Sequence, residues 1–270
     1  MKFFKDPFII SEIGINHNGN LSNAFKLIDS SIRAGASAVK FQTYKTEKRV
    51  KKNSPIFNIL KKCELNNDDF IKIKKYCDKK KIIFFSTPFD VESVYFLEKL
   101  KVKLFKVASF DIANYEILNA IIKTKIPTIL STGMATKIEI DKAYDLFKKK
   151  NISLAFLHCV SNYPNNETTS YLSCIEYLKK RYDCPIGLSD HTNDIKIARY
   201  GYLMGAKIIE KHFTTDSQYK CVDKPVSINE KQMKQLINEI EYLKKIIGTP
   251  KFGQRPEEKN TLKYKNVKKK

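Results

Sequence analysis

The sequence lacks the signatures of several common protein classes. Its six cysteines, at positions 63, 77, 159, 174, 184 and 221, form no C-x-x-C pair. Neither a zinc ribbon nor a thioredoxin-type redox site is therefore indicated. An unpatterned set of cysteines in a chain of 270 residues is typical of a reducing compartment, so we expect a cytoplasmic protein.

Long apolar runs and leader-like segments are also missing. No apolar run approaches the roughly 20 residues that a transmembrane helix needs, so no membrane partner is expected. The start, MKFFKDPFII, is interrupted by Lys5 and Asp6 and does not form the apolar region of a signal peptide. Neither G-x-G-x-x-G nor G-x-x-x-x-G-K-[ST] occurs, which disfavours an open doubly wound nucleotide-binding sheet.

Acidic residues are few beside the basic ones. The chain has 50 Lys and Arg against 29 Asp and Glu, a formal net charge of +21. The lysines are spread over almost every polar segment, whereas a nucleic-acid footprint gathers on one stripe. We interpret them as solvated helix faces that also help to attract anionic substrates, and we expect no nucleic-acid partner.

Short apolar runs alternate with segments of helical spacing, as in parallel strands connected by helices. We predict eight strands, over residues 8–15, 38–44, 82–89, 104–109, 127–134, 153–160, 185–190 and 207–214. Eight such units predict an α/β fold, a (β/α)₈ TIM barrel, over residues 1–248. Residues 249–270 lose the periodicity and are predicted to be an extension or linker. The Lys/Asn-rich insertion at 45–66 fits an active-site flap or a plain surface loop.

Polar residues follow the ends of these strands, where barrels carry their active sites. Lys40 and Lys106 sit inside otherwise apolar runs, where an unpaired lysine is costly. With Ser and Thr hydroxyls nearby they would make a pocket for a phosphate or carboxylate, or they would pair with Glu12 or Glu210 as structural ions.

His191 and His212, two of only four histidines, end the last two predicted strands. Imidazoles from adjacent strand ends can meet at one divalent cation such as Mn²⁺. From spacing alone, two unrelated loop histidines fit equally well.

Eight stretches resemble, in order and spacing, the sialic acid synthase family, which includes N-acetylneuraminate, legionaminate and pseudaminate synthases. They are SEIGINHNGN, AVKFQTYK, FFSTPFD, FKVASFDIANYEIL, ILSTGMAT, LHCVSNYP, GLSDHT and IIEKHFTTD, between about residues 6 and 262. The resemblance implies a barrel transferase that condenses phosphoenolpyruvate with an open-chain N-acylated hexose of the N-acetylmannosamine type and releases phosphate. A 2,4-diacetamido sugar is the alternative substrate.

The resemblance also implies roles for individual residues. His191 and His212 match metal ligands, with Mn²⁺ expected and Mg²⁺ or Co²⁺ as alternatives. Positions around phosphoenolpyruvate correspond to Lys40, Thr87, Lys106, Ser109, Ser131 and Ser189, and positions around the sugar to Glu12, Gln42, Asp111, Tyr163 and Asp223. Glu12, Asp111, His191 and His212 are the expected catalytic residues. Ser161, at the end of the sixth strand, is a further candidate substrate contact. Asp111 stands where some members have Glu.

Family members usually continue into a small antifreeze-like domain that reaches over the partner's site in a homodimer and supplies an arginine to the sugar. This sequence ends at NVKKK, about where that domain would begin. A fragment and a naturally short synthase both fit. A catalytically impaired barrel that binds sugar or anion is the rival from another class.

Overall fold

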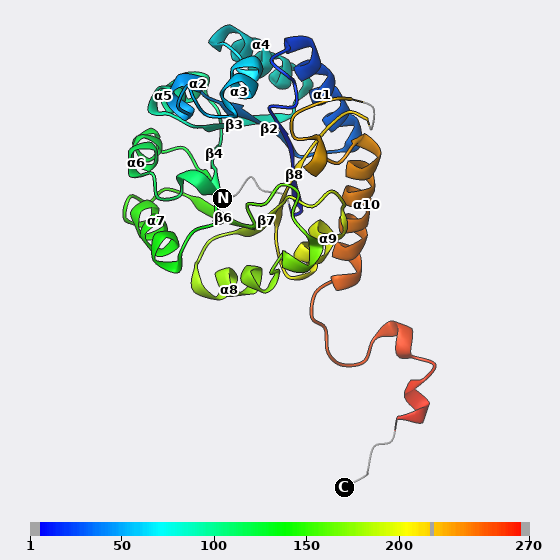
Figure 1. The fold of residues 1–270 in the computed structure, drawn as a ribbon. Helices are drawn as coiled ribbons and strands as arrows, with labels where there is room; N and C mark the ends of the chain where they lie inside the picture. The colour runs from blue at the N-terminus through cyan, green and yellow to red at the C-terminus, as the bar shows by residue number, and fades with distance from the viewer. Residues whose placement is uncertain (1–5, 217–218, 266–270) are drawn as a thin grey trace.

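Eight parallel strands close into a barrel, as predicted (Figure 1). The computed structural model describes residues 6–216 and 219–265; the first five residues, on which part of the leader argument rested, lie outside this range. The strands are β1 (Phe8–Gly14), β2 (Ala38–Thr43), β3 (Ile83–Pro88), β4 (Phe105–Val107), β5 (Thr128–Ser131), β6 (Leu154–Cys159), β7 (Ile186–Asp190) and β8 (Ile208–His212). The pairing of β1 with β8 closes the barrel.

Helices surround the barrel, one after each strand. They are α1 (Leu21–Ala34), α4 (Asn67–Lys80), α5 (Val91–Lys99), α6 (Tyr115–Thr124), α7 (Lys137–Lys149), α8 (Ser173–Arg181), α9 (Lys196–Leu203) and α10 (Glu230–Ile247). Side chains of Asn20 and Thr136 cap α1 and α7 by accepting backbone N–H groups. Gly35 ends α1 at φ 91°, a left-handed conformation that glycine adopts without strain.

The barrel interior changes in character from one end to the other. Alternate residues of each strand face the barrel interior. The inward-facing residues that come first along the strands are apolar. This inner core contains Phe8, Ile10, Ala38, Phe85, Leu104, Ile129, Ala155, Leu157 and Ile208. The next inward positions, towards the carboxyl ends, are polar. A second and larger core lies between the strands and the helices.

The insertion after β2 folds into two short helices, α2 (Thr46–Arg49) and α3 (Phe57–Cys63). Tyr44, Leu60 and Cys63 form a small satellite core with Ile15, and the Tyr44 hydroxyl donates to the Leu60 carbonyl at 2.9 Å. This packing holds the insertion against the carboxyl end of the barrel.

The chain after α10 leaves the barrel. Residues 249–265 contain two short 3₁₀ turns, Pro256–Glu258 and Leu262–Tyr264, and are almost entirely exposed. In Figure 1 this segment extends away from the barrel. Within the described ranges, no helix has both the length and the apolar character required to cross a membrane.

Candidate active site

A cavity of about 360 Å³ opens at the carboxyl ends of the strands, a size typical of small-molecule sites. Strand alternation turns the polar residues above the inner core into this cavity. Its wall includes Glu12, Lys40, Gln42, Thr87, Lys106, Ser109, Ser131, Tyr163, Ser189, His191, His212 and Asp223. The structure therefore brings together all the predicted site residues except Asp111 and Ser161.

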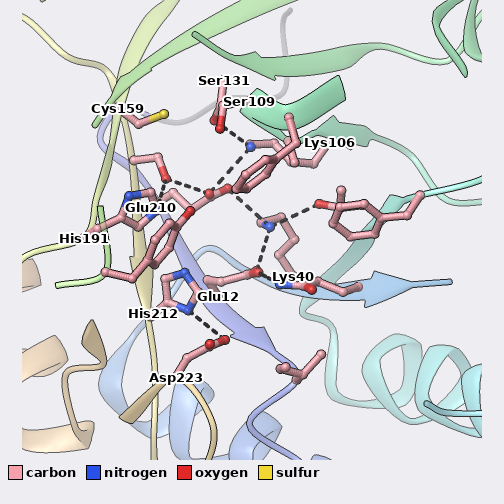
Figure 2. A pocket seen from close by; sticks show the side chains of 18 of the residues that line it. Glu12, Lys40, Lys106, Ser109, Ser131, Cys159, His191, Glu210, His212 and Asp223 are labelled. Atoms are coloured by element: carbon pink, nitrogen blue, oxygen red, sulfur yellow. Dashed lines mark hydrogen bonds and ion pairs between the residues drawn. The ribbon is translucent and has the colours of Figure 1, made fainter. Parts of the chain in front are cut away.

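The floor of the cavity holds two buried lysines and two buried glutamates (Figure 2). Lys40 Nζ lies 2.8 Å from Glu12 Oε2 and 3.8 Å from Glu210 Oε2. Lys106 Nζ lies 3.7 Å from Glu210 Oε1 and donates to Ser131 Oγ at 2.7 Å. The predicted pairing with Glu12 and Glu210 is confirmed. Both lysines also line the cavity, and their binding of a phosphate or carboxylate stays a prediction.

The two glutamates have opposite protonation tendencies. Burial raises the pKa of Glu12, although Lys40 opposes this effect. Burial would also raise the pKa of Glu210, but Lys106 and Lys40 outweigh it and hold this pKa at about 2. Glu210 is therefore an ionised carboxylate between the two lysines, whereas burial makes the Glu12 carboxyl easier to protonate. Any loss of negative charge at Glu12 makes the floor more suitable for an anionic ligand.

His191 and His212 face each other above this floor, with ring centroids 5.5 Å apart. His191 Nδ1 lies 2.8 Å from the Val160 carbonyl, so in the neutral ring Nδ1 carries the hydrogen and Nε2 keeps its lone pair. Burial, together with neighbouring His212, lowers the pKa of His191 to about 3. His191 is therefore a neutral imidazole at physiological pH.

Asp223 stands beside the second histidine. Its Oδ2 lies 3.3 Å from His212 Nδ1. Burial alone would lower the pKa of His212, but the Asp223 carboxylate outweighs it and raises this pKa. Asn16 Oδ1 accepts the Asp223 backbone N–H at 2.9 Å and so anchors the loop that carries this carboxylate.

The imidazoles of His191 and His212 are suitable ligands for a divalent cation. Metal ligation needs neutral imidazole, as His191 has, and it favours a histidine whose other nitrogen faces a carboxylate, as His212 does. Among the described residues, no group of three or more His, Cys, Asp or Glu side chains is arranged to hold a metal ion. A cation here would take two protein ligands and complete its shell with water or substrate oxygens.

Gly14 has no side chain and so leaves room for the side chains of Glu12, Gln42 and Asp223. A β-carbon on Gly14 would lie 3.1 Å from Glu12 Oε1 and 3.3 Å from both Gln42 Nε2 and Asp223 Oδ2. Its φ of +54° is also one that L-residues rarely adopt. Glycine here keeps the sugar side of the expected site open.

Asp111 and Ser161 stand behind the cavity wall. Ser161 Oγ shares a 2.8 Å hydrogen bond with Ser109 Oγ, and Asp111 accepts from Asn114 Nδ2 at 3.0 Å. Ser161 thereby contacts a residue that lines the cavity, whereas Asn114, the partner of Asp111, does not line it. The direct roles predicted for Asp111 and Ser161 stay predictions. His158 and Cys159 point to opposite sides: Cys159 lines the cavity, whereas His158 Nε2 lies 2.8 Å from the Ser170 carbonyl.

Sequence reasoning missed several residues of the wall. Glu210 was predicted only as a structural partner of the lysines, although its alternation with His212 could have assigned it to the site. Arg49, Ile56, Phe89 and Phe110 also line the cavity. Arg49 and Ile56 come from the insertion, whose sequence shows no period from which an inward side could be predicted.

A closed barrel with two buried lysines in the floor of its cavity and two facing histidines above them defines a class of barrel protein whose site suits a small anionic molecule. The chain belongs to the NeuB family, whose sequence profile matches residues 27–252. This confirms the resemblance to the sialic acid synthases.

Two curated relatives and one solved structure illustrate the likeness. The N,N'-diacetyllegionaminic acid synthase of Campylobacter jejuni is 35% identical over 95% of this chain and 82% of its own length. An uncharacterised protein of Methanocaldococcus jannaschii is 36% identical over 94% of this chain and 76% of its own. The crystal structure of the N-acetylneuraminic acid synthetase of Leptospira borgpetersenii, in complex with citrate, matches with a TM-score of 0.93 and 40% identity, covering 96% of this chain and 91% of that one.

Proposed function

We propose that this protein condenses phosphoenolpyruvate with the aldehyde of an open-chain N-acylated hexose, and releases a nine-carbon sialic acid and phosphate. The observation that carries this proposal is the pair of buried lysines, Lys40 and Lys106, below two facing histidines in one cavity. N-acetylmannosamine is the first candidate sugar. A 2,4-diacetamido sugar is the second, because one curated relative is a diacetyllegionaminic acid synthase.

The floor would hold the anionic substrate. Lys40 and Lys106 offset the charges of the phosphate and carboxylate groups, and the hydroxyls of Thr87, Ser131 and Ser189 offer hydrogen bonds. These hydroxyls already contact the floor, since Lys40 donates to Thr87 at 3.2 Å and Ser189 donates to Glu210 at 2.9 Å. The floor is thus preorganised for an anion.

In the reaction, C3 of phosphoenolpyruvate bonds to the aldehyde carbon of the sugar, and the aldehyde oxygen takes up a proton. Water adds to C2, the C2–O bond to phosphate breaks, and C2 becomes a ketone. Of the two protons of this water, one balances the proton taken up by the aldehyde oxygen and the other leaves with the phosphate. His191 and His212 would hold a divalent cation, which when bound polarises the sugar aldehyde. Glu12, whose pKa is raised and which contacts Lys40 and Gln42, would carry a proton in this reaction.

The test is phosphate release from phosphoenolpyruvate in the presence of Mn²⁺, Mg²⁺ or Co²⁺, with N-acetylmannosamine and 2,4-diacetamido sugars in separate assays. We expect release that depends on both the sugar and the cation and stops on chelation. The substitutions His191→Ala and His212→Ala should each abolish it. Full metal-dependent turnover in both variants would rule out the cation site, and no release with any sugar would rule out the synthase.

Two further expectations rest on the family resemblance and the charge pattern. We expect a homodimer, which analytical ultracentrifugation would show as a single species of about twice the 31.3 kDa chain mass.

The rival activity, nucleic-acid binding, predicts a salt-sensitive mobility shift with DNA or RNA. We expect no such shift at physiological ionic strength.

A further inference from the structure

Arg49 reaches the cavity from the insertion after β2. Its guanidinium carbon lies 3.6 Å from the centroid of the Phe89 ring and 4.8 Å from that of Tyr44. One of its nitrogens, Nη1, donates to Gln42 Oε1 at 3.0 Å. Gln42 in turn donates from Nε2 to Glu12 Oε1 at 3.3 Å. The guanidinium is thereby held in one plane, by a ring on one side and an amide at one edge.

Much of the hydrogen-bonding capacity of Arg49 is unused. In the described parts of the chain, no carboxylate lies within ion-pair distance of it, whereas Lys40 and Lys106 both have glutamate partners. Gln42 takes one of its five N–H donors. Burial lowers the pKa of Arg49, although Tyr44 and Asp111 oppose this effect, as expected for a cation that has lost water without gaining a close counter-charge.

The surroundings of Arg49 narrow the choice of ligand group. Ile56, Phe89 and Phe110 line the cavity with it. Ile56 is 47% exposed and Phe110 is 64% exposed, so this is the mouth of the cavity, whereas Lys40 and Lys106, at 4% and 3%, mark its floor. A guanidinium next to apolar side chains suits a group with a hydrogen-bond-accepting oxygen and a small apolar end. An N-acyl group has both, a carbonyl oxygen and a methyl.

A phosphate fits the mouth less well. Asp111 and Asp223 act electrostatically on the Arg49 guanidinium from beyond ion-pair distance, so its positive charge is already partly offset. A neutral carbonyl oxygen is not repelled by these carboxylates as a phosphate would be.

We propose that Arg49 binds the acylamino group of the sugar and is the residue with which this chain distinguishes N-acylated hexoses from their unmodified counterparts. This inference rests on the proposed function. It concerns the sugar at the mouth of the cavity and leaves the phosphoenolpyruvate floor unchanged.

The test compares Arg49→Met and Arg49→Lys with Lys48→Met as the matched control. Lys48 precedes Arg49 on α2, but its side chain is exposed and pairs with Glu92 at 2.5 Å. The KM of each protein is measured for N-acetylmannosamine, for mannose and for phosphoenolpyruvate. Sugar binding is measured in parallel by calorimetry in the presence of phosphoenolpyruvate, so that a readout exists without turnover.

In Arg49→Met we expect the preference for N-acetylmannosamine over mannose to fall about 10- to 100-fold, the range of one hydrogen bond to a charged group. The KM for phosphoenolpyruvate should stay within about twofold of wild type. Arg49→Lys keeps the charge but loses the planar fork, so its preference should lie between those of wild type and Arg49→Met. Lys48→Met should match wild type.

A purely structural role for Arg49 would weaken both sugars equally and leave their ratio unchanged, and this result would overturn the proposal. If wild type shows no turnover but binds N-acetylmannosamine, and Arg49→Met does not, the proposed reaction fails while the role of Arg49 holds. If wild type neither turns over nor binds any of the sugars, both fail.

Discussion

Lys106 combines burial with incomplete charge compensation. Burial lowers its pKa, an effect that Glu210 opposes from 3.7 Å away. We expect Lys106→Met to raise the KM for phosphoenolpyruvate about 10- to 100-fold, because a charge-assisted contact to an anion is lost. Glu210 keeps its contacts with Lys40 and Ser189, so the variant should fold.

Steady-state kinetics with varied phosphoenolpyruvate would measure this effect. Lys103→Met is the control, since Lys103 is exposed and lies three residues away in the sequence. An unchanged KM in Lys106→Met would show that the lysine serves the glutamates alone.

His17 gives the folded chain a defined dependence on pH. The ring is 1% exposed, its Nδ1 accepts the Gly19 N–H at 3.1 Å, and burial lowers its pKa from 6.5 to about 4. Between these two pH values the unfolded chain binds a proton that the folded chain does not. Stability is therefore unaffected by this group above pH 6.5 and falls as the pH drops towards 4, by about 3 kcal/mol in all.

Urea unfolding of wild type and His17→Gln at pH 7.5, 5.5 and 4.5 would isolate this contribution. The difference between the two proteins should shrink on acidification, because the variant lacks the titrating ring. Parallel pH curves would show that His17 is protonated as readily in the folded chain as in the unfolded one.

The contrast between Lys106 and Arg49 indicates how far membership of the site can be predicted from the sequence. Lys106 was assigned to the site because a cation inside an apolar run is conspicuous in any strand. Arg49 stands among other charged residues, in TEKR, and its inward direction depends on the ring of Phe89, 40 positions later. No local pattern encodes that contact.

At the scale of elements, the carboxyl ends of β7 and β8 are joined by a buried ion pair. Lys211 Nζ lies 3.0 Å from Asp190 Oδ2, both side chains are at most 1% exposed, and Lys211 also donates to the Thr192 carbonyl. Asp190 accepts the Thr192 backbone N–H at 2.9 Å. Because His191 lies between Asp190 and Thr192, and His212 follows Lys211, this pair holds the backbone under both histidines.

We expect Asp190→Asn to destabilise the protein by about 3–5 kcal/mol, because Lys211 would remain buried without a counter-charge. Urea unfolding measures this, and the double variant Asp190→Asn/Lys211→Met should be less destabilised than the sum of the two single changes. Lys207→Met, which removes an exposed partner of Asp6, should change stability by no more than about 0.5 kcal/mol. Strict additivity in the double variant would contradict the coupling.

All eight predicted strands form, because continuous apolar runs between helical segments are a strong signal for buried parallel strands. Their ends differ most at β5, which was predicted to reach residue 134 and ends at Ser131. The shortest strand is β4, with three residues, since the chain turns into a 3₁₀ helix at Ser109–Asp111. This turn brings Ser109 to the cavity and places Asp111 behind it. The insertion was predicted as flap or loop; its helices supply part of the cavity wall, a role that depends on the satellite core around Tyr44.

At the scale of the whole molecule, the interior of the barrel is apolar in one half and polar in the other. The inner core below and the lysine–glutamate floor above use successive inward positions of the same strands, such as Ile208, Glu210 and His212 on β8. The register of β1 with β2 sets Glu12 beside Lys40, whereas closure of the barrel by β1 and β8 is needed to set Glu12 beside His212. The site can therefore exist only when the ring is complete.

The boundary predicted at residue 248 can be tested on the same scale. After Gly248 the chain makes hydrogen bonds within its own turns, such as Arg255 Nη2 to the Lys251 carbonyl at 2.9 Å, and most of its described side chains are exposed. It buries little apolar surface, so its removal should cost the barrel little free energy. We expect a chain ending at Gly248 to keep the unfolding midpoint of the full sequence within about 1 °C, since surface changes are generally worth less than about 0.5 kcal/mol. Differential scanning calorimetry of the two chains measures this.

Removing Ile240–Gly248 as well is the matched comparison, because Ile240 is fully buried against the barrel, and this deletion should lower the midpoint by many degrees. A large loss of stability on the shorter deletion would place residues 249–270 inside the folding unit and overturn the boundary.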